Sequence, residues 1–282
     1  MKPLFELFVM KPLEENSRSW YDLFMRENLE SEIQIPKQRN GISPILTGLV
    51  GGVFGLLLGI FMNISGSSAS KTPAVSPSLM KPLIINTTIN GEQIRIVGKP
   101  MGDVSGNSRY TLGDSAAKLT MTEFADYKCG YCRLFATQTL SQIKKEFIDT
   151  GKLRFVYRDM ITVGGNEAFR AANAAACVNE SGHYWDFHNQ LYGAAHDTWV
   201  GLTGINLDNK LSEIAGNVGA DSSSVKTCLN TQKYLKDVNT DHQLGTDLEL
   251  GGTPAFVVGG YFFSGALPLE AWREVFKALG VS

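Results

Sequence analysis

Two cysteines separated by two residues, Cys129 and Cys132, constrain the fold of this chain more than any other feature of its sequence. Residues Leu119 to Ala125 before the pair have the composition of a buried strand, and residues Cys132 to Thr150 after it repeat apolar side chains at helical spacing. A cysteine pair between a strand and a helix indicates redox chemistry, because the free N–H groups at a helix N-terminus stabilise a thiolate. Cys129 is then the expected nucleophile and Cys132 its less exposed partner.

Half of a zinc site is the main alternative for this cysteine pair. Zinc needs two further ligands at suitable spacing, and the candidates are Cys177, His183 and His188. They lie in a separate helical segment and form no second pair of the same kind, so we expect no metal. Lys128 immediately precedes the first cysteine and is expected to place a cation beside its thiolate.

Two other features strengthen the redox interpretation. Glu123 lies six residues before Cys129, within an otherwise apolar strand, where burial would raise its pKa and let it take a proton from Cys132. An ordinary exposed strand acid is the alternative. Pro254 follows Thr253 at the start of a later strand, a position compatible with a cis peptide bond that would leave the Thr253 backbone free to pair with an extended substrate.

The rest of the C-terminal region alternates between strand and helix patterns. Strands are predicted at 153–158, 255–258 and 261–263, and helices at 166–178, 184–192, 207–218, 222–230, 234–249 and 269–279. The aromatic cluster of Tyr184, Trp185, Phe187 and His188 is expected to be core rather than a site. The order β-α-β, helical block, β-β-α predicts an α/β domain over 110–282, with a helical insertion at about 165–249.

An uncharged stretch divides the chain. Residues 45–62 are 18 consecutive, almost entirely apolar residues, enough for one transmembrane helix, which we expect at 43–64. A buried core helix or a signal peptide cleaved near Ala69 are the alternatives, but more than 40 residues precede the apolar run. Lys37 and Arg39 lie close before the span, so the positive-inside rule predicts a cytoplasmic N-terminus and an outer C-terminal region.

The segments before and after the expected span carry no catalytic motif. Residues 1–42 form a cytoplasmic segment without a chemical motif, 65–80 a flexible linker, and 81–109 a β-hairpin extension with an Asn90-Gly91 turn. Gly51, Gly55 and Gly59 share one helix face, which suits a dimer in the membrane. The net charge of −2 gives no reason to expect nucleic acid as a partner.

The stretches TEFADYKCGYC and GGTPAFVVGG, with the inserted helices between them, resemble the DsbA-like branch of the thioredoxin superfamily over roughly 110–279. The resemblance implies a thioredoxin-like fold with a helical insertion, no cofactor, and catalysis of disulfide formation. It assigns Cys129 as the attacking cysteine, Cys132 as its partner, Glu123 as the buried acid and Pro254 as the cis-proline. It also implies substrate contacts at Thr253, Gly130 and Tyr131.

Cys177 and Cys228 lie in the insertion, where related domains often carry a cysteine pair. The resemblance therefore implies a structural disulfide between them, with two separate buried thiols or a second redox pair as alternatives.

The direction of electron flow is less constrained. The dipeptide Gly130-Tyr131, like Thr253, is similar to that of DsbC-type isomerases, but 83–97 is too short for their dimerisation domain. We therefore expect an oxidase of exported cysteine-containing polypeptides, with an isomerase or reductase as the alternative. A second alternative is a non-catalytic chaperone anchored in the membrane. The resemblance implies reoxidation by a DsbB-like or VKOR-like membrane protein, at the inner or plasma membrane with the catalytic domain periplasmic or extracellular.

Overall fold

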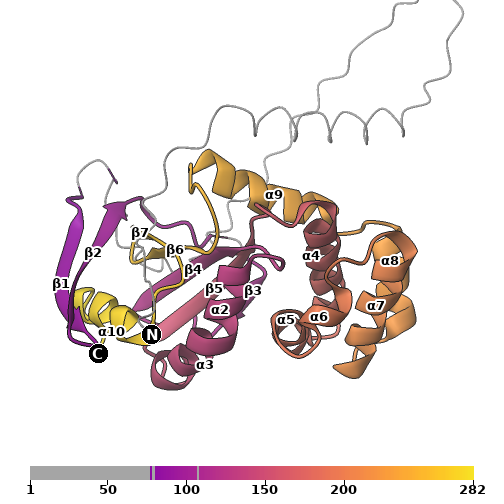
Figure 1. Cartoon of the computed structure of the whole chain (residues 1–282), viewed down its shortest axis with the longest axis horizontal. Coiled ribbons are helices and arrows are strands. Elements are labelled where there is room, and N and C mark those ends of the chain that lie inside the picture. The colour runs from indigo at the N-terminus through magenta and orange to yellow at the C-terminus, as the bar shows by residue number, and fades with distance from the viewer. Residues whose placement is uncertain (1–76, 78–79, 107) are drawn as a thin grey trace, which may run out of the picture. The chain divides into compact units, whose positions relative to one another are not determined.

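The computed structural model describes residues 77, 80–106 and 108–282 (Figure 1). The expected membrane span at 43–64, with its glycine face, lies outside the described residues, as do segments 1–42 and 65–76. Within the described ranges, no helix combines the length and the apolar character needed to cross a bilayer.

One sheet organises the described part of the chain, with seven strands in the order β1-β2-β7-β6-β4-β5-β3. Their bounds are β1 Leu83–Ile89, β2 Glu92–Pro100, β3 Tyr110–Leu112, β4 Leu119–Ala125, β5 Leu153–Asp159, β6 Ala255–Val258 and β7 Tyr261–Ser264. Strands β4 and β5 are parallel, and β6 pairs antiparallel with β4 on its other side. Six of the seven residues of β4 are buried, so both faces of this strand are covered.

The N-terminal hairpin extends this sheet. Strands β1 and β2 pair antiparallel across a turn formed by Asn90 and Gly91, which adopt φ values of 52° and 83°. These positive φ angles are those required by a two-residue turn that matches the twist of the strands. Strand β2 then joins β7 through the pairs Lys99–Phe262 and Pro100–Tyr261.

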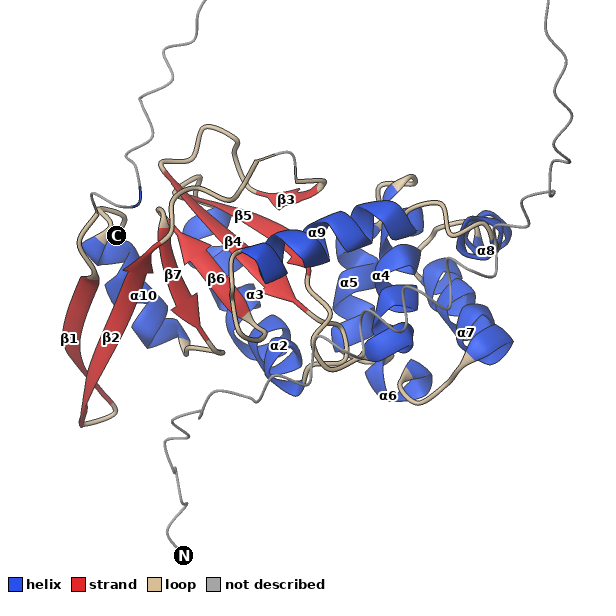
Figure 2. Cartoon of the chain, turned by 90° about the horizontal axis from the view of Figure 1, so that it is seen from above, coloured by secondary structure: helices blue, strands red, loops and turns tan. Residues whose placement is uncertain are grey.

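Helices cover both faces of the sheet (Figures 1 and 2). The helix that follows the cysteine pair consists of α2 Gly130–Leu134, the π-helical turn η2 Phe135–Thr139, α3 Leu140–Ile143 and the π-helical turn η3 Lys144–Ile148. It lies with α10 Leu269–Ala278 on one face, and α9 Leu235–Asp247 crosses the other. Trp272 of α10 packs edge-on against Phe256 of β6, with ring centroids 4.8 Å apart. The helix and the sheet thus share one aromatic core.

The insertion between β5 and β6 forms a helical block beside the sheet (Figure 1). Its members are α4 Gly165–Asn179, α5 Tyr184–Tyr192, α6 His196–Trp199, α7 Gly204–Asn217 and α8 Ser222–Asn230, with α9 running back over the sheet. Helix α4 is alanine-rich and buried along most of its length, so small side chains let its neighbours approach it closely. Tyr184, Phe187 and His188 are buried, which confirms their expected place in the core.

Two short elements were not predicted from the sequence. Strand β3 has three residues and is defined by its antiparallel pairing with β5, for example Tyr110 with Tyr157. Helix α6 has four residues and begins after the Gly193 turn. Neither is long enough to show a periodic pattern.

Candidate active site

The cysteine pair lies where β4 ends and α2 begins. Cys129 is the N-cap residue of α2: its backbone is extended, with φ −74° and ψ 120°, and its carbonyl accepts the N–H of Arg133 at 3.0 Å. The N–H of Cys129 donates to the carbonyl of Asp126 at 2.9 Å, which fixes the turn before the helix. The Cys129 sulfur therefore faces the unpaired N–H groups of the first helical turn.

The surroundings of Cys129 favour its thiolate. A hydrogen bond from the Cys132 thiol lowers the pKa of Cys129 most, and burial opposes this. Hydrogen bonds from the Thr253 side chain and from the backbone of Cys132 and Tyr131 lower it further, to about 6. Cys129 is 7% exposed, whereas Cys132 is completely buried, so Cys129 is the cysteine of the pair that a substrate can reach. At pH 7 such a thiol is roughly 90% ionised, against about 3% for a free cysteine of pKa 8.5.

Cys132 and Glu123 are buried behind Cys129. Burial raises the pKa of Cys132 far above its ordinary value, and its hydrogen bond to Cys129 and the charge of Glu123 add to the effect. Glu123 is 1% exposed in the middle of β4, and burial, followed by the charge of Cys129, raises its pKa well above the usual range. No described residue hydrogen-bonds its Oε2 atom. Glu123 therefore lies where a protonated carboxylic acid is favoured, next to the buried thiol.

The turn before β6 faces the cysteine pair from the other side. The peptide bond between Thr253 and Pro254 is cis. The thiol of Cys129 donates to the carbonyl of Thr253 at 3.2 Å, across 124 positions of sequence. Pro254 is buried, whereas the Thr253 side chain lies within reach of Thr162, with their hydroxyl oxygens 2.8 Å apart.

The two residues between the cysteines are open to solvent. A side chain at Gly130 would meet no atom within 4 Å, and Tyr131 is 67% exposed. Val163, from the loop after β5, is likewise 67% exposed. The sequence singled out Gly130 and Tyr131, but Val163 has no local signal that marks it.

The cation expected beside Cys129 is itself paired. The Nζ atom of Lys128 forms an ion pair with Oε2 of Glu167 on α4 at 2.7 Å. Glu167 also accepts the N–H of Gly201 at 3.1 Å. The low pKa of Cys129 comes first from the hydrogen bond of the Cys132 thiol, then from the Thr253 side chain and the backbone at the helix start, and Lys128 is not among these causes.

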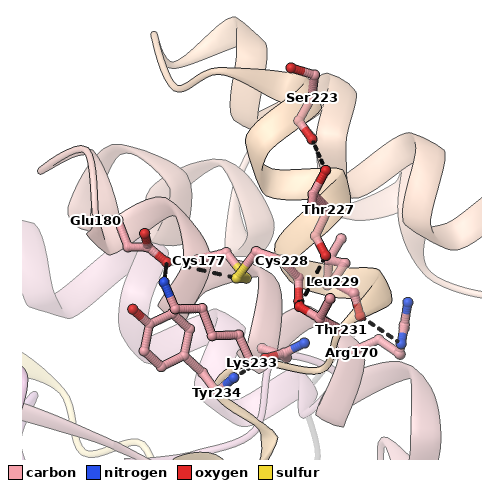
Figure 3. The surroundings of a disulfide bond; sticks show 11 residues. Arg170, Cys177, Glu180, Ser223, Thr227, Cys228, Leu229, Thr231, Lys233 and Tyr234 are labelled. Atoms are coloured by element: carbon pink, nitrogen blue, oxygen red, sulfur yellow. Dashed lines mark hydrogen bonds and ion pairs between the residues drawn. A yellow bond between two sulfur atoms is a disulfide. The ribbon is translucent and has the colours of Figure 1, made fainter.

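Cys177 and Cys228 form a disulfide bond between α4 and α8, at the far side of the insertion (Figure 3). The sulfurs are 2.06 Å apart, and both residues are buried. Beside them, Glu180 forms an ion pair with Lys233 at 2.9 Å. Cys129 and Cys132 are both free thiols, so the two pairs are chemically different within one domain.

Comparisons with known proteins identify relatives of the C-terminal part of the chain. The sequence model of the family described as Thioredoxin matches residues 105–278. Disulfide bond formation protein D of Bacillus subtilis (strain 168) is 28% identical over 163 residues, which cover 56% of this chain and 70% of that protein. A putative protein-disulfide oxidoreductase of Rickettsia typhi is 25% identical over 159 residues, covering 55% of this chain and 56% of its own length.

Solved structures show the same fold. The oxidised form of BdbD from Bacillus subtilis superposes with a TM-score of 0.53 at 23% identity, covering 59% of this chain and 90% of that one. The thiol-disulfide exchange protein alpha-DsbA2 from Wolbachia pipientis gives a TM-score of 0.50 at 25% identity, covering 60% and 86%. The expected thioredoxin-like fold with a helical insertion is confirmed. Because the family match spans more than half of the chain, the protein belongs to the thioredoxin family, as a DsbA-like thiol–disulfide oxidoreductase.

Proposed function

We propose that this protein introduces disulfide bonds into exported polypeptides, with Cys129 and Cys132 as its redox pair. The observation that carries this proposal is the contrast between the two thiols: the pKa of Cys129 is lowered to about 6, whereas that of Cys132 is raised. A stabilised Cys129 thiolate favours the reduced enzyme, and a stable reduced form makes the oxidised form a stronger oxidant. The pKa of Cys129 is lowered from 9.0 to about 6 on folding, so this stabilisation is complete above about pH 9, is only partly present at neutral pH, and is lost as pH falls through about 6.

The reaction follows from the positions of these groups. A substrate thiolate attacks the Cys129 sulfur, the Cys129–Cys132 bond breaks, and Cys132 leaves as a thiolate that takes a proton from Glu123. A second substrate thiolate then attacks the substrate sulfur of the mixed disulfide and displaces the Cys129 thiolate. The substrate loses two electrons and the enzyme gains them. During reoxidation Glu123 takes the proton back from Cys132.

The Thr253–Pro254 turn suits the binding of the substrate chain. The Thr253 carbonyl lies 3.2 Å from the Cys129 sulfur, so an extended peptide whose cysteine reaches Cys129 also passes this turn. Gly130 and Tyr131 supply the adjoining open surface. We assign Pro254 to shaping the turn, Thr253 to backbone pairing with substrate, and Cys177 and Cys228 to structural stability.

An oxidation assay tests the proposed function. The full-length oxidised protein is expected to introduce disulfides into reduced, unfolded ribonuclease in stoichiometric amounts, and its thiolate absorbance in the reduced form should titrate near pH 6. The same preparation should act slowly on scrambled ribonuclease. If scrambled ribonuclease is the better substrate, the protein is an isomerase. If insulin reduction dominates, it is a reductase, and inactivity in all three assays would leave only the chaperone alternative.

We propose further that the catalytic domain lies outside the cytoplasm, anchored by the span at 43–64, and that a DsbB-like or VKOR-like membrane protein reoxidises it. The Cys177–Cys228 disulfide supports this location, because disulfides persist in oxidising compartments. The cations Lys37 and Arg39 before the apolar run support the orientation.

Labelling with a membrane-impermeant maleimide tests this topology. After mild reduction of cells, or of spheroplasts where an outer membrane intervenes, Cys129 should be labelled without lysis of the inner membrane. A cysteine introduced by Ser17→Cys, in a chain carrying Cys129→Ala, should be labelled only after lysis. Protection of Cys129 together with labelling at position 17 would reverse the orientation and exclude an oxidase of exported proteins.

A further inference from the structure

A buried carboxylate next to the cysteine pair has no part in the chemistry above. Asp126 is the first residue after β4, three positions before Cys129, and is 1% exposed. Its Oδ1 atom accepts the N–H of Lys128 at 2.8 Å, and its Oδ2 atom accepts the N–H groups of Thr162, Val163 and Gly164, each at 2.9 Å. A buried carboxylate is stable only where hydrogen bonds replace its hydration, and four backbone donors meet that need here.

The three consecutive donors belong to the loop between β5 and α4. Since they all point at one oxygen, the loop is wrapped around the carboxylate. Gly164 has no room for a side chain: a Cβ atom there would lie 2.2 Å from the Cβ of Ala168 and 2.7 Å from Oδ1 of Asp126. The same loop presents Val163, which is 67% exposed, to solvent. Asp126 thus fixes the position of an apolar side chain that belongs to a distant part of the sequence.

The loop also reaches the turn on the far side of the cysteine pair. The hydroxyl oxygens of Thr162 and Thr253 are 2.8 Å apart, and the Thr253 carbonyl is 3.2 Å from the Cys129 sulfur. The backbone carbonyl of Asp126 accepts a hydrogen bond from the Cys129 N–H at 2.9 Å. Asp126 therefore connects the segment before α2 to the 162–164 loop, and Thr162 connects that loop to Thr253.

We infer that Asp126 is a positioning residue for peptide substrates: its carboxylate holds the 162–164 loop in place beside Thr253, as one side of the surface on which an extended, cysteine-containing peptide reaches Cys129. This inference rests on the proposed oxidation of polypeptides and adds the part of the site that selects a peptide over a small thiol. Asp126 makes no contact with the substrate sulfur in this scheme. We therefore expect removal of the Asp126 carboxylate to weaken peptide binding and to leave the rate of thiol exchange itself unchanged.

The variant Asp126→Asn tests the inference in the full-length chain. An amide has one oxygen and one NH2 group, so it cannot accept all four N–H donors, and its own hydrogens face some of them. We expect the KM for a short unfolded peptide with two cysteines to rise about tenfold, which corresponds to about 1.4 kcal/mol, with kcat nearly unchanged. The rate constant for oxidation of dithiothreitol, a small thiol that does not need this loop surface, should stay within about twofold of the wild type.

The chain offers a matched control. Asp114 makes the same kind of turn, with Oδ1 accepting the N–H of Ala116 at 2.8 Å, but lies exposed before β4. Asp114→Asn should leave both the peptide and the dithiothreitol reactions unchanged. If the wild type fails to oxidise the peptide, the proposed function is wrong. If the wild type succeeds and Asp126→Asn matches Asp114→Asn, or loses both reactions equally, the inference is wrong.

A second variant decides the matter if Asp126→Asn does not fold. Thr162→Val removes the hydroxyl that meets Thr253 and leaves the carboxylate and its four donors in place. It should raise the peptide KM about threefold and leave the dithiothreitol reaction unchanged. An unchanged peptide KM in a folded Thr162→Val protein would overturn the inference.

Discussion

The variant Cys132→Ala is expected to accumulate mixed disulfides with exported proteins, whereas Cys129→Ala should accumulate none and lose at least about 10³-fold of the oxidation rate. Cys129 is the thiol at the helix start with the lowered pKa, and it lies on the solvent side of the pair. Cys132 is fully buried and its pKa is raised, so it is a poor nucleophile toward a polypeptide. Once Cys132 is absent, no neighbouring thiol can release a substrate bonded to Cys129.

Non-reducing gels followed by mass spectrometry of the trapped species measure this effect. A Cys132→Ala chain that also carries Cys177→Ala and Cys228→Ala provides the control, and it should trap the same partners. Trapping through Cys132 in a Cys129→Ala chain, at a level similar to that of Cys132→Ala, would contradict the assignment of the nucleophile. Loss of trapping in the triple variant would instead give the second pair a direct part in substrate exchange.

Removal of the second pair should destabilise the protein without stopping catalysis. The Cys177–Cys228 bond closes a loop of 51 positions, and the chain-entropy relation gives such a loop about 4 kcal/mol of unfolding free energy. For a domain of this size that corresponds to a fall in Tm of roughly 8–16 °C. Cys177 lies 12 positions along α4 from its first residue, Gly165, or roughly 18 Å at 1.5 Å per residue. The cysteine pair at α2 should therefore keep most of its activity.

Chemical denaturation of the oxidised Cys177→Ala/Cys228→Ala protein measures the free energy, and ribonuclease oxidation measures the activity. The single variant Cys177→Ala should lose about as much stability as the double variant, because either change removes the disulfide bond between α4 and α8. A loss below about 1 kcal/mol would contradict a structural role. A collapse of activity in a protein that remains folded would point to a second redox pair instead.

The sequence alone located most of the regular elements. Helix α5 and strand β6 have the predicted bounds, because each shows a complete apolar pattern between clear turn signals. The Asn90-Gly91 turn was predicted for the same reason, since only a few residues favour its positive φ angles. The three-residue strand β3 could not be predicted, because it exists through its pairing with β5 and has no pattern of its own.

Within the candidate site, the sequence identified the residues that we propose carry chemical function, and the tertiary structure determined which of them meet. Cys129, Cys132 and Glu123 could be found locally because a strand, a short turn and a helix start place them within ten consecutive positions. The membrane span stays a prediction from the sequence. Three contacts of the site join segments that lie 36 to 124 positions apart in the sequence. They are those of Thr253 with Cys129, of Glu167 with Lys128, and of Asp126 with the 162–164 loop. Such contacts depend on how segments far apart in the sequence pack around the sheet, which no local pattern encodes.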